Sequence, residues 1–153
     1  MSKQYKLSYS GFRYSLAMLT NPEGTLGPLR GHNLEVTYNF YFDSCIEMED
    51  IYNWLDSLTK DLDHKTIISE NQKGVEVHKI KDYYSVKWLN YRIELPCNEV
   101  YVIKGNNSHI ITILENLLLI VKQNWKKFPN YTKIEVIGSD LPYRSHCVSE
   151  LVR

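Results

Sequence analysis

The chain has 153 residues, of which 43% are hydrophobic, so it is long enough to bury one core and too short for two domains of ordinary size. Eighteen Lys and Arg residues balance eighteen Asp and Glu residues, which excludes a strong overall field that would attract nucleic acid, a membrane surface or an acidic partner. We therefore expect one globular domain over residues 1–153, with no nucleic-acid or membrane partner.

The three cysteines, Cys45, Cys97 and Cys147, are widely spaced and odd in number, which favours a reducing compartment over a disulfide framework. The first residues lack the apolar core of a signal peptide, and no apolar run reaches the ~18 residues that a membrane-spanning helix needs. We expect a cytoplasmic protein.

Alternating polarity predicts two long strands, one at 5–20 with Gly11 at a bulge or bend, and one at 34–42. The segment 21–28 between them holds two prolines and two glycines and is expected to form a loop. In the second strand the even-numbered residues are apolar and the odd-numbered ones are mostly polar, so one face should be buried.

Apolar residues at helical spacing predict an amphipathic helix over 51–62, preceded by Glu47, Glu49 and Asp50, which complement its dipole. Short β-type runs follow within 75–103, and the part at about 75–95 is expected to be an inserted hairpin or small meander.

A second helix is predicted over 109–125, where Asn-Asn-Ser at 106–108 can cap its start. It is apolar around most of its circumference, so it must be covered on more than one side. Another subunit would supply that second cover, which favours a homo-oligomer. A final strand at 133–137 and an irregular tail to residue 153 complete the prediction.

This order of elements, with Gly31-His32-Asn33 before the second strand and Leu62-Asp63-His64-Lys65 after the first helix, resembles the 6-pyruvoyltetrahydropterin synthase and 6-carboxytetrahydropterin synthase family. The insert resembles the archaeal branch in particular. The resemblance implies an α+β tunnelling fold, with an antiparallel sheet and two helices packed on one face. It also implies that the sheets of several subunits, in a trimer or hexamer, join into a β-barrel with active sites between subunits.

Active members of that family bind zinc through three histidines, which align here with Met18, Arg30 and His32. A thioether is a poor zinc ligand and a guanidinium cannot lose its proton to become one, so we expect no family-type zinc and no other cofactor. Arg30 instead either favours an anionic ligand or pairs with a carboxylate. The family's catalytic cysteine aligns with segment 25–28, which holds Leu26 and no thiol.

Asp63 and His64 match the aspartate and histidine that the family uses for proton transfer. A carboxylate beside an imidazole can fix the tautomer of the ring, which suits acid–base catalysis. The same two residues at a helix end can equally serve as a structural cap.

The glutamate that holds the pterin in the family aligns with Gly138, which Ser139 follows. Its loss weakens the case for pterin recognition by a carboxylate. Glu115 either takes part in ligand binding or faces solvent or another subunit. Together with Arg30 and His32, these are the predicted ligand-binding residues.

Three functions follow from these substitutions. The first is a divergent protein that binds a pterin- or purine-like heterocycle, or assembles with another protein, without the family's lyase activity. The second is an enzyme of the pterin or deazapurine pathway that uses Asp63 and His64 as acid and base. The third is a conventional zinc enzyme, in which His64, His78, His109 or His146 joins His32 in binding the metal.

Overall fold

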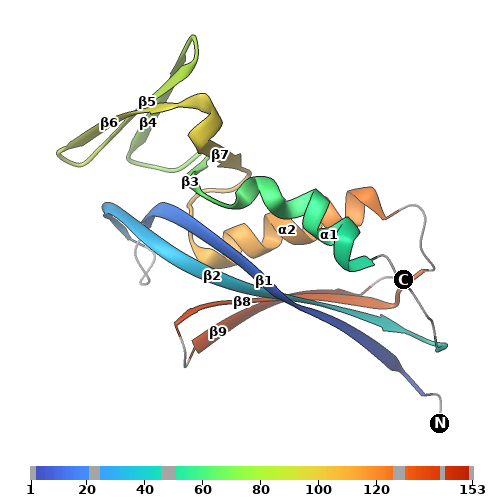
Figure 1. Ribbon diagram of the computed structural model, residues 1–153. Coiled ribbons are helices and arrows are strands. Elements are labelled where there is room, and N and C mark those ends of the chain that lie inside the picture. Colours follow the sequence, from blue (N-terminus) through green and yellow to red (C-terminus); the bar gives the residue numbers. More distant parts are fainter. Residues whose placement is uncertain (1–2, 21–24, 46–50, 126–129, 142–143, 152–153) are drawn as a thin grey trace. The chain divides into compact units, whose positions relative to one another are not determined.

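The computed structural model describes residues 3–20, 25–45, 51–125, 130–141 and 144–151. The described residues form nine strands, two α-helices and two short 3₁₀ helices (Figure 1). In chain order these are β1 (Tyr5–Thr20), β2 (Leu26–Phe42), α1 (Ile51–Thr59), η1 (Lys60–Leu62), β3 (Lys65–Ser69), β4 (Val75–Ile80), β5 (Tyr83–Trp88), β6 (Tyr91–Pro96), η2 (Cys97–Glu99), β7 (Val100–Ile103), α2 (Ile110–Asn124), β8 (Lys133–Leu141) and β9 (Arg144–Leu151).

The strands form two sheets. Six of them lie in the order β7-β3-β1-β2-β8-β9, and the other three form a separate sheet in the order β4-β5-β6. Strand β3 pairs in parallel with both β1 and β7, whereas β8 pairs antiparallel with β2 and β9. The expected α+β class is confirmed, but the large sheet is mixed rather than antiparallel throughout, because β3 returns alongside β1 after a helix.

Residue contacts divide the chain into two compact units. The first consists of Met1–Arg13, Leu34–Lys60 and Leu114–Arg153, and the second of Tyr14–Asn33 and Asp61–Ile113. The boundaries between these units fall inside β1, β2, η1 and α2. The expectation of a single domain stays a prediction.

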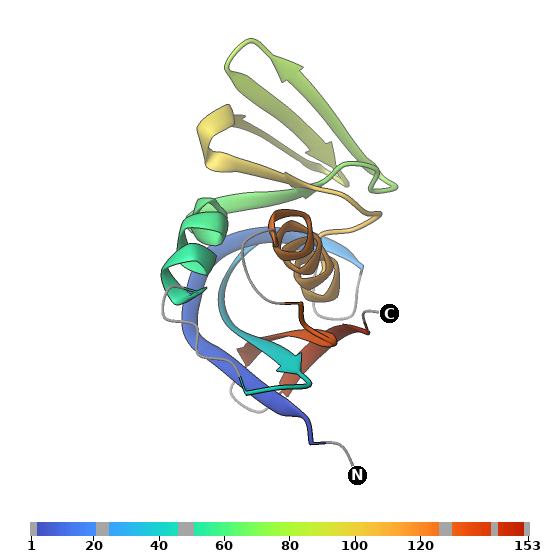
Figure 2. The ribbon, with the colours of Figure 1, turned by 90° about the vertical axis from the view of Figure 1, so that its right-hand side faces the viewer.

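The core of the first unit lies between its strands and its helices, and Figures 1 and 2 show α1 and the end of α2 on the same side of these strands. Phe40 is fully buried, and its ring stacks on that of Trp125 at 4.7 Å. Trp125 in turn contacts Trp54 of α1 edge to face at 5.6 Å, and Phe12 of β1 stacks on Tyr52 at 4.7 Å. Such aromatic pairs contribute beyond the area that they bury.

In the second unit, an apolar cluster joins β1, β3 and the small sheet. Its buried members are Leu19, Ile68, Val86 and Trp88. The Trp88 indole N–H donates to the Gly27 carbonyl oxygen at 2.8 Å, so the polar end of this large side chain is satisfied.

Three segments differ from the sequence-based expectation. The predicted loop over 21–28 is already strand from Leu26 onward, as the start of β2, and residues 21–24 lie outside the described part. The tail is not irregular, because β9 pairs with β8 along most of its length. The third difference is strand β3, which the sequence analysis did not predict.

Other expectations are confirmed. Gly11 in β1 has a φ of +90°, which only glycine adopts readily. The Asn107 side-chain oxygen accepts hydrogen bonds from the His109 N–H and the Thr112 hydroxyl, and His109 Nδ1 accepts one from the Ile111 N–H, so Asn107 and His109 together cap the start of α2. Residues 46–50, with the acidic residues predicted before α1, lie outside the described part.

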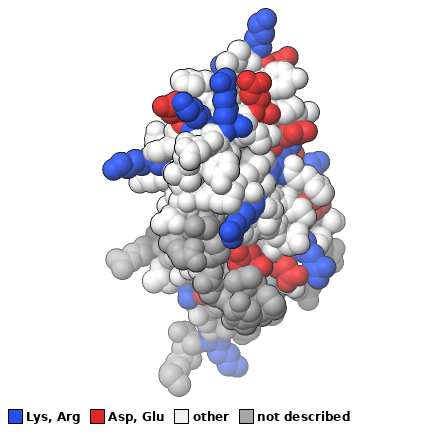
Figure 3. All heavy atoms as spheres, turned by 90° about the vertical axis from the view of Figure 1, so that its left-hand side faces the viewer, with Lys and Arg blue, Asp and Glu red and all other residues white. Residues whose placement is uncertain are grey.

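Charge is mixed over the surface. Figure 3 shows Lys and Arg side chains next to Asp and Glu side chains on one face, without a large area of a single sign. In the described ranges, no helix combines the length and the apolar character needed to cross a membrane. The cytoplasmic location stays a prediction.

Candidate functional site

The parallel pairing of β1 with β3 places Asp63 and His64 beside Ser15, because Leu16 lies opposite Lys65 in this pairing. The Ser15 backbone N–H donates to Asp63 Oδ1 at 2.7 Å. The His64 N–H donates to the Ser15 carbonyl oxygen at 2.6 Å and to Asp63 Oδ1 at 3.1 Å. Backbone hydrogen bonds therefore fix the direction of the Asp63 carboxylate.

The His64 imidazole lies next to that carboxylate. Its Nε2 is 3.6 Å from Asp63 Oδ2, which is too long for a direct hydrogen bond but permits electrostatic attraction. The His64 side chain is 80% exposed and that of Asp63 is 37% exposed. An anchored carboxylate beside a solvent-facing imidazole is able to exchange protons with a ligand.

His64 also has an unusual backbone conformation, with a φ of +59°. This left-handed region is unfavourable for a residue with a Cβ, although histidine is found there more often than most. Such conformations cluster at functional sites. A left-handed residue also commonly ends a helix, and His64 follows η1 closely, so this conformation agrees with a structural cap as well as with a functional role.

Two further polar residues belong to this site and were not selected from the sequence. Ser15 Oγ donates to Asn33 Oδ1 at 3.1 Å, from β1 to β2. Both residues are exposed and lie on the polar face of their strands. The alternation of β1 places Ser15 on a polar face, but only the β1–β3 pairing shows that the Ser15 backbone meets Asp63.

The three positions aligned with zinc ligands lie on two neighbouring strands of the large sheet. Met18 lies near the end of β1, and Arg30 and His32 lie in the first part of β2. Met18 is 2% exposed, His32 is half-buried and Arg30 is exposed.

The side chains at these positions do not fit zinc. The His32 imidazole is a good ligand, but the Met18 thioether is a weak one and the Arg30 guanidinium stays protonated. Within the described ranges, no group of three or more His, Cys, Asp or Glu side chains is arranged to hold a metal ion. The absence of zinc from this protein stays a prediction.

Of the predicted ligand-binding residues, Arg30 and His32 belong to the second unit, and Glu115, Gly138 and Ser139 belong to the first. Glu115 is exposed on α2, and Ser139 pairs with Glu35 of β2. A Cβ at Gly138 would come within 2.6 Å of Cδ2 of the buried Leu114. A glutamate at this position would therefore collide with α2.

The three cysteines are not paired in disulfides. Cys45 and Cys147 are exposed and Cys97 is half-buried, all with free thiols. Burial, followed by the nearby Glu135 carboxylate, raises the pKa of Cys147, which is the opposite of what a thiolate nucleophile needs.

No family model and no curated protein matches the chain. Solved structures do match it. 6-pyruvoyl tetrahydropterin synthase from Plasmodium falciparum gives a TM-score of 0.84 at 16% identity, covering 97% of this chain and 99% of that chain. The Plasmodium vivax enzyme gives 0.78 at 19% identity, covering 98% and 99%.

Two further Plasmodium vivax structures carry substitutions of a glutamate described as catalytic. An uncharacterized protein from Wolinella succinogenes gives a TM-score of 0.62 at 16% identity, covering 96% of this chain and 98% of that chain. At such low identities these matches establish architecture rather than activity. The chain has the α+β tunnelling fold of 6-pyruvoyltetrahydropterin synthase.

Proposed function

We propose that this chain is a divergent, archaeal-type relative of 6-pyruvoyltetrahydropterin synthase that has lost the family's zinc chemistry. It binds a pterin- or purine-like heterocycle, or assembles with another protein, without the lyase activity. The observation that carries this proposal is the set of side chains at the three aligned positions, Met18, Arg30 and His32, of which only His32 is a strong zinc ligand.

Two further observations support the loss of the family's activity. The position of the catalytic cysteine, near Leu26, holds no thiol, and the space for a pterin-binding glutamate at Gly138 is filled by Leu114. Recognition of a heterocycle would then rely on Arg30 and His32, which supply hydrogen-bond donors.

The experiment is elemental analysis of the purified native protein, expressed as zinc per chain, for the natural sequence and for the double variant Met18→His with Arg30→His. We expect no zinc in the natural protein and about one ion per chain in the variant, which would have three imidazole ligands. The single variant Arg30→His, with two imidazoles, is the matched control and should bind zinc more weakly.

About one zinc per chain in the natural protein would refute the proposal and favour a conventional zinc enzyme. A double variant that folds but gains no zinc would show that Met18 and Arg30 are not at the ligand positions.

The second candidate is an enzyme that acts on the same class of heterocycle with Asp63 and His64 as acid and base, and with Arg30 stabilising negative charge. The anchored carboxylate of Asp63 beside the His64 imidazole favours it. The catalytic glutamate named in the Plasmodium vivax structures supports the view that a carboxylate can serve catalysis in this fold.

An assay distinguishes the two candidate functions: pterins and purines are incubated with the protein, and their conversion is followed by mass spectrometry. If the protein is an enzyme, Asp63→Asn and His64→Ala should each lower turnover by about 10²–10⁴. Asp56→Asn and His78→Ala change exposed residues elsewhere and should leave turnover unchanged. A protein that binds a heterocycle without converting it would support the first candidate.

We also propose that the chain forms a homo-oligomer of the trimer or hexamer type. Of the described strands, β9 forms one edge of the large sheet, and its Leu151 is 66% exposed. An open edge of eight residues is able to pair with a strand of another copy. Native mass spectrometry tests this, and a monomer at micromolar concentration would contradict it.

A further inference from the structure

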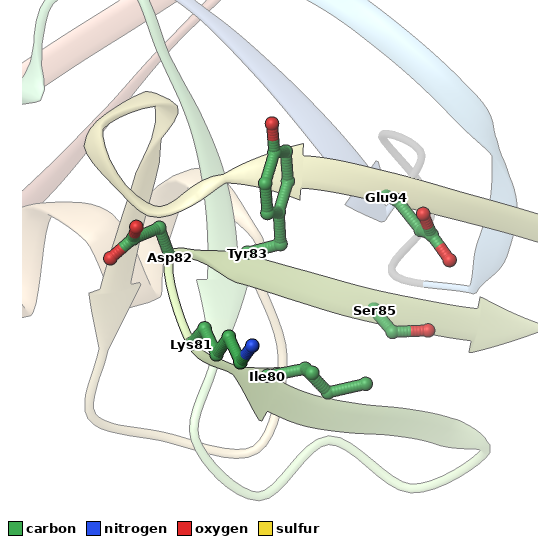
Figure 4. A pocket seen from close by; sticks show the side chains of 6 residues that line it. All are labelled: Ile80, Lys81, Asp82, Tyr83, Ser85 and Glu94. Carbon is green, nitrogen blue, oxygen red and sulfur yellow. The ribbon is translucent and has the colours of Figure 1, made fainter.

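The small sheet has a hollow on the face opposite its buried residues. Strand alternation turns Val86 and Trp88 of β5 toward the apolar cluster, and Tyr83 and Ser85 toward the other face. There the structure has a hollow of about 250 Å³ (Figure 4). It is lined by Ile80, Lys81, Asp82, Tyr83, Ser85 and Glu94.

The walls of this hollow combine apolar and polar surface. Ile80 is 59% exposed and Tyr83 is 54% exposed, which is unusual for such large side chains at neighbouring positions. Within the described part of the chain, the Lys81 ammonium and the hydroxyls of Tyr83 and Ser85 take part in no side-chain hydrogen bond or ion pair. These groups are therefore available to a ligand.

The charges lie at opposite ends of the hollow. Figure 4 shows Lys81 at one end beside Ile80, and Glu94 at the other end beside Ser85, while the Asp82 carboxylate points away. Glu94 has only a loose ion pair with Arg92, at 3.7 Å with both side chains mostly exposed, and such a pair is weak. A ligand with a positive group at one end and a negative group at the other matches this arrangement.

The turn that carries Lys81 is held in place. Lys81 has a φ of +52°, and the Cys97 N–H donates to the Asp82 carbonyl oxygen at 2.7 Å, which ties the turn to η2. A fixed turn reduces the entropy lost when a ligand binds.

We propose that this hollow binds a small zwitterion whose two charges are separated by an apolar body, of the class of short apolar peptides. The ligand's ammonium contacts Glu94 and Ser85, its carboxylate contacts Lys81, and its apolar part packs against Tyr83 and Ile80. The volume is below the ~300–1,000 Å³ of pockets for drug-sized molecules, which favours a ligand of about two amino-acid residues.

The test is titration of the full-length protein with the dipeptide leucyl-leucine, followed by amide chemical shifts in NMR. We expect saturable shifts at residues 80–85 and 94. Lys81→Gln and Glu94→Gln should each weaken binding about tenfold, because each removes one charge-assisted hydrogen bond. Lys87→Gln, a change of the same kind on β5 outside the hollow, is the matched control and should leave affinity unchanged.

Dipeptides with one end chemically blocked test which residue of the protein contacts each charge of the ligand. N-acetylation should weaken binding to the natural protein but not to Glu94→Gln, and C-terminal amidation should weaken binding to the natural protein but not to Lys81→Gln. Equal binding of the doubly blocked dipeptide would overturn the proposal, as would an absence of shifts at millimolar leucyl-leucine. Shifts at these residues that depend on protein concentration without peptide would also overturn it, because they would assign the face to a second copy of the chain.

Discussion

A single carboxylate organises the polar face of β2 and β8. Glu135 is 16% exposed, and it accepts hydrogen bonds from the Tyr41 hydroxyl at 2.5 Å and the Asn39 amide at 3.3 Å, with the Lys133 ammonium 3.4 Å away. Asn39 itself is only 2% exposed. Burial of a polar group costs little when the group is hydrogen-bonded in this way. The pairing with Glu135 therefore allows a polar residue to be buried at position 39.

The Tyr41 hydroxyl should contribute measurably to stability. Tyr41→Phe removes one donor from Glu135 and leaves the packing of the ring in place. Since a hydrogen bond to a charged group contributes about 1.5–3 kcal/mol, we expect the free energy of unfolding, measured in urea, to fall by about 1–2 kcal/mol. Tyr83→Phe, which removes an exposed hydroxyl without a side-chain partner in the described part, is the matched control and should change little.

The effect of Tyr41→Phe should depend on pH. The hydrogen bond from Tyr41 lowers the pKa of Glu135 from 4.5, so this stabilisation is present above pH 4.5 and is lost as the pH falls further. The hydrogen bond to Glu135, with burial, raises the pKa of Tyr41 from 10.0 to about 12. That stabilisation is present below pH 10.0 and is lost as the pH rises toward 12.

The difference in unfolding free energy between the natural protein and Tyr41→Phe should therefore be largest near neutrality. It should shrink below pH 4.5 and above pH 10.0. A difference that stays constant over this range would contradict the pairing of Tyr41 with Glu135.

Gly138 is required by packing rather than by backbone conformation. Gly138→Ala would place a Cβ 2.6 Å from Leu114 Cδ2, and Leu114 is fully buried, so it has little room to move. Overpacking of this kind destabilises by about 1–3 kcal/mol. Gly31→Ala is the matched control, since a Cβ at Gly31 meets nothing within 4 Å. Equal thermal stability of the two variants would contradict this assignment.

At the scale of elements, the turn between β5 and β6 is under strain. Trp88 pairs with Tyr91, so Leu89 and Asn90 form a two-residue turn. Leu89 has a φ of +50° and is 58% exposed, whereas Asn90 has no positive φ, and a two-residue turn with positive φ at its first position alone favours glycine there. Leucine at this position contributes neither burial nor a favourable conformation.

Leu89→Gly should therefore stabilise the protein. Glycine avoids the cost of about 1–2 kcal/mol that a Cβ adds at positive φ, and its greater backbone entropy offsets about 0.5–1 kcal/mol of this, so we expect a net gain of about 0.5–1 kcal/mol in urea unfolding. Leu89→Ala removes the same apolar surface but keeps a residue that disfavours positive φ, so it should give no gain. A gain of the same size in Leu89→Ala would show that lost apolar exposure, and not the backbone, is responsible.

Elements with a clear period were predictable, and those without one were not. The long strands, both helices and the small meander follow from alternation or from helical spacing. Strand β3 (Lys65–Ser69) is buried at Thr66 and every later position, so it shows no alternation, and a short apolar run of this kind does not distinguish strand from helix. Strand β9 (Arg144–Leu151) carries little apolar character and forms through its pairing with β8.

At the scale of the whole molecule, the candidate site was predictable only in part. The pair Asp63-His64 is visible in the sequence, and so are the substitutions at Met18 and Arg30. The contact of Asp63 with Ser15 is not visible, because it depends on β3 running beside β1, a contact between residues 48 positions apart. Sequence patterns report local periodicity, whereas a site of this kind depends on tertiary pairing.

The two compact units share continuous elements, since their boundaries cut through β1, β2, η1 and α2. The two strands and α2 each have hydrogen bonds on both sides of the boundary, so unfolding of one unit also removes hydrogen bonds next to the boundary in the other. We therefore expect a single cooperative transition in urea, as in small one-domain proteins.

Tryptophan positions allow this to be measured. Trp88 lies in the second unit, and Trp54 and Trp125 lie in the first, and the chain has no other tryptophan. Trp88→Phe leaves fluorescence to report the first unit, and the double variant Trp54→Phe with Trp125→Phe leaves it to report the second. In each variant the fluorescence transition should coincide with that of its own far-ultraviolet circular dichroism, which follows the whole chain. Transitions that separate in both variants would mean that the units unfold independently, and that residues 1–153 do not form one cooperative domain.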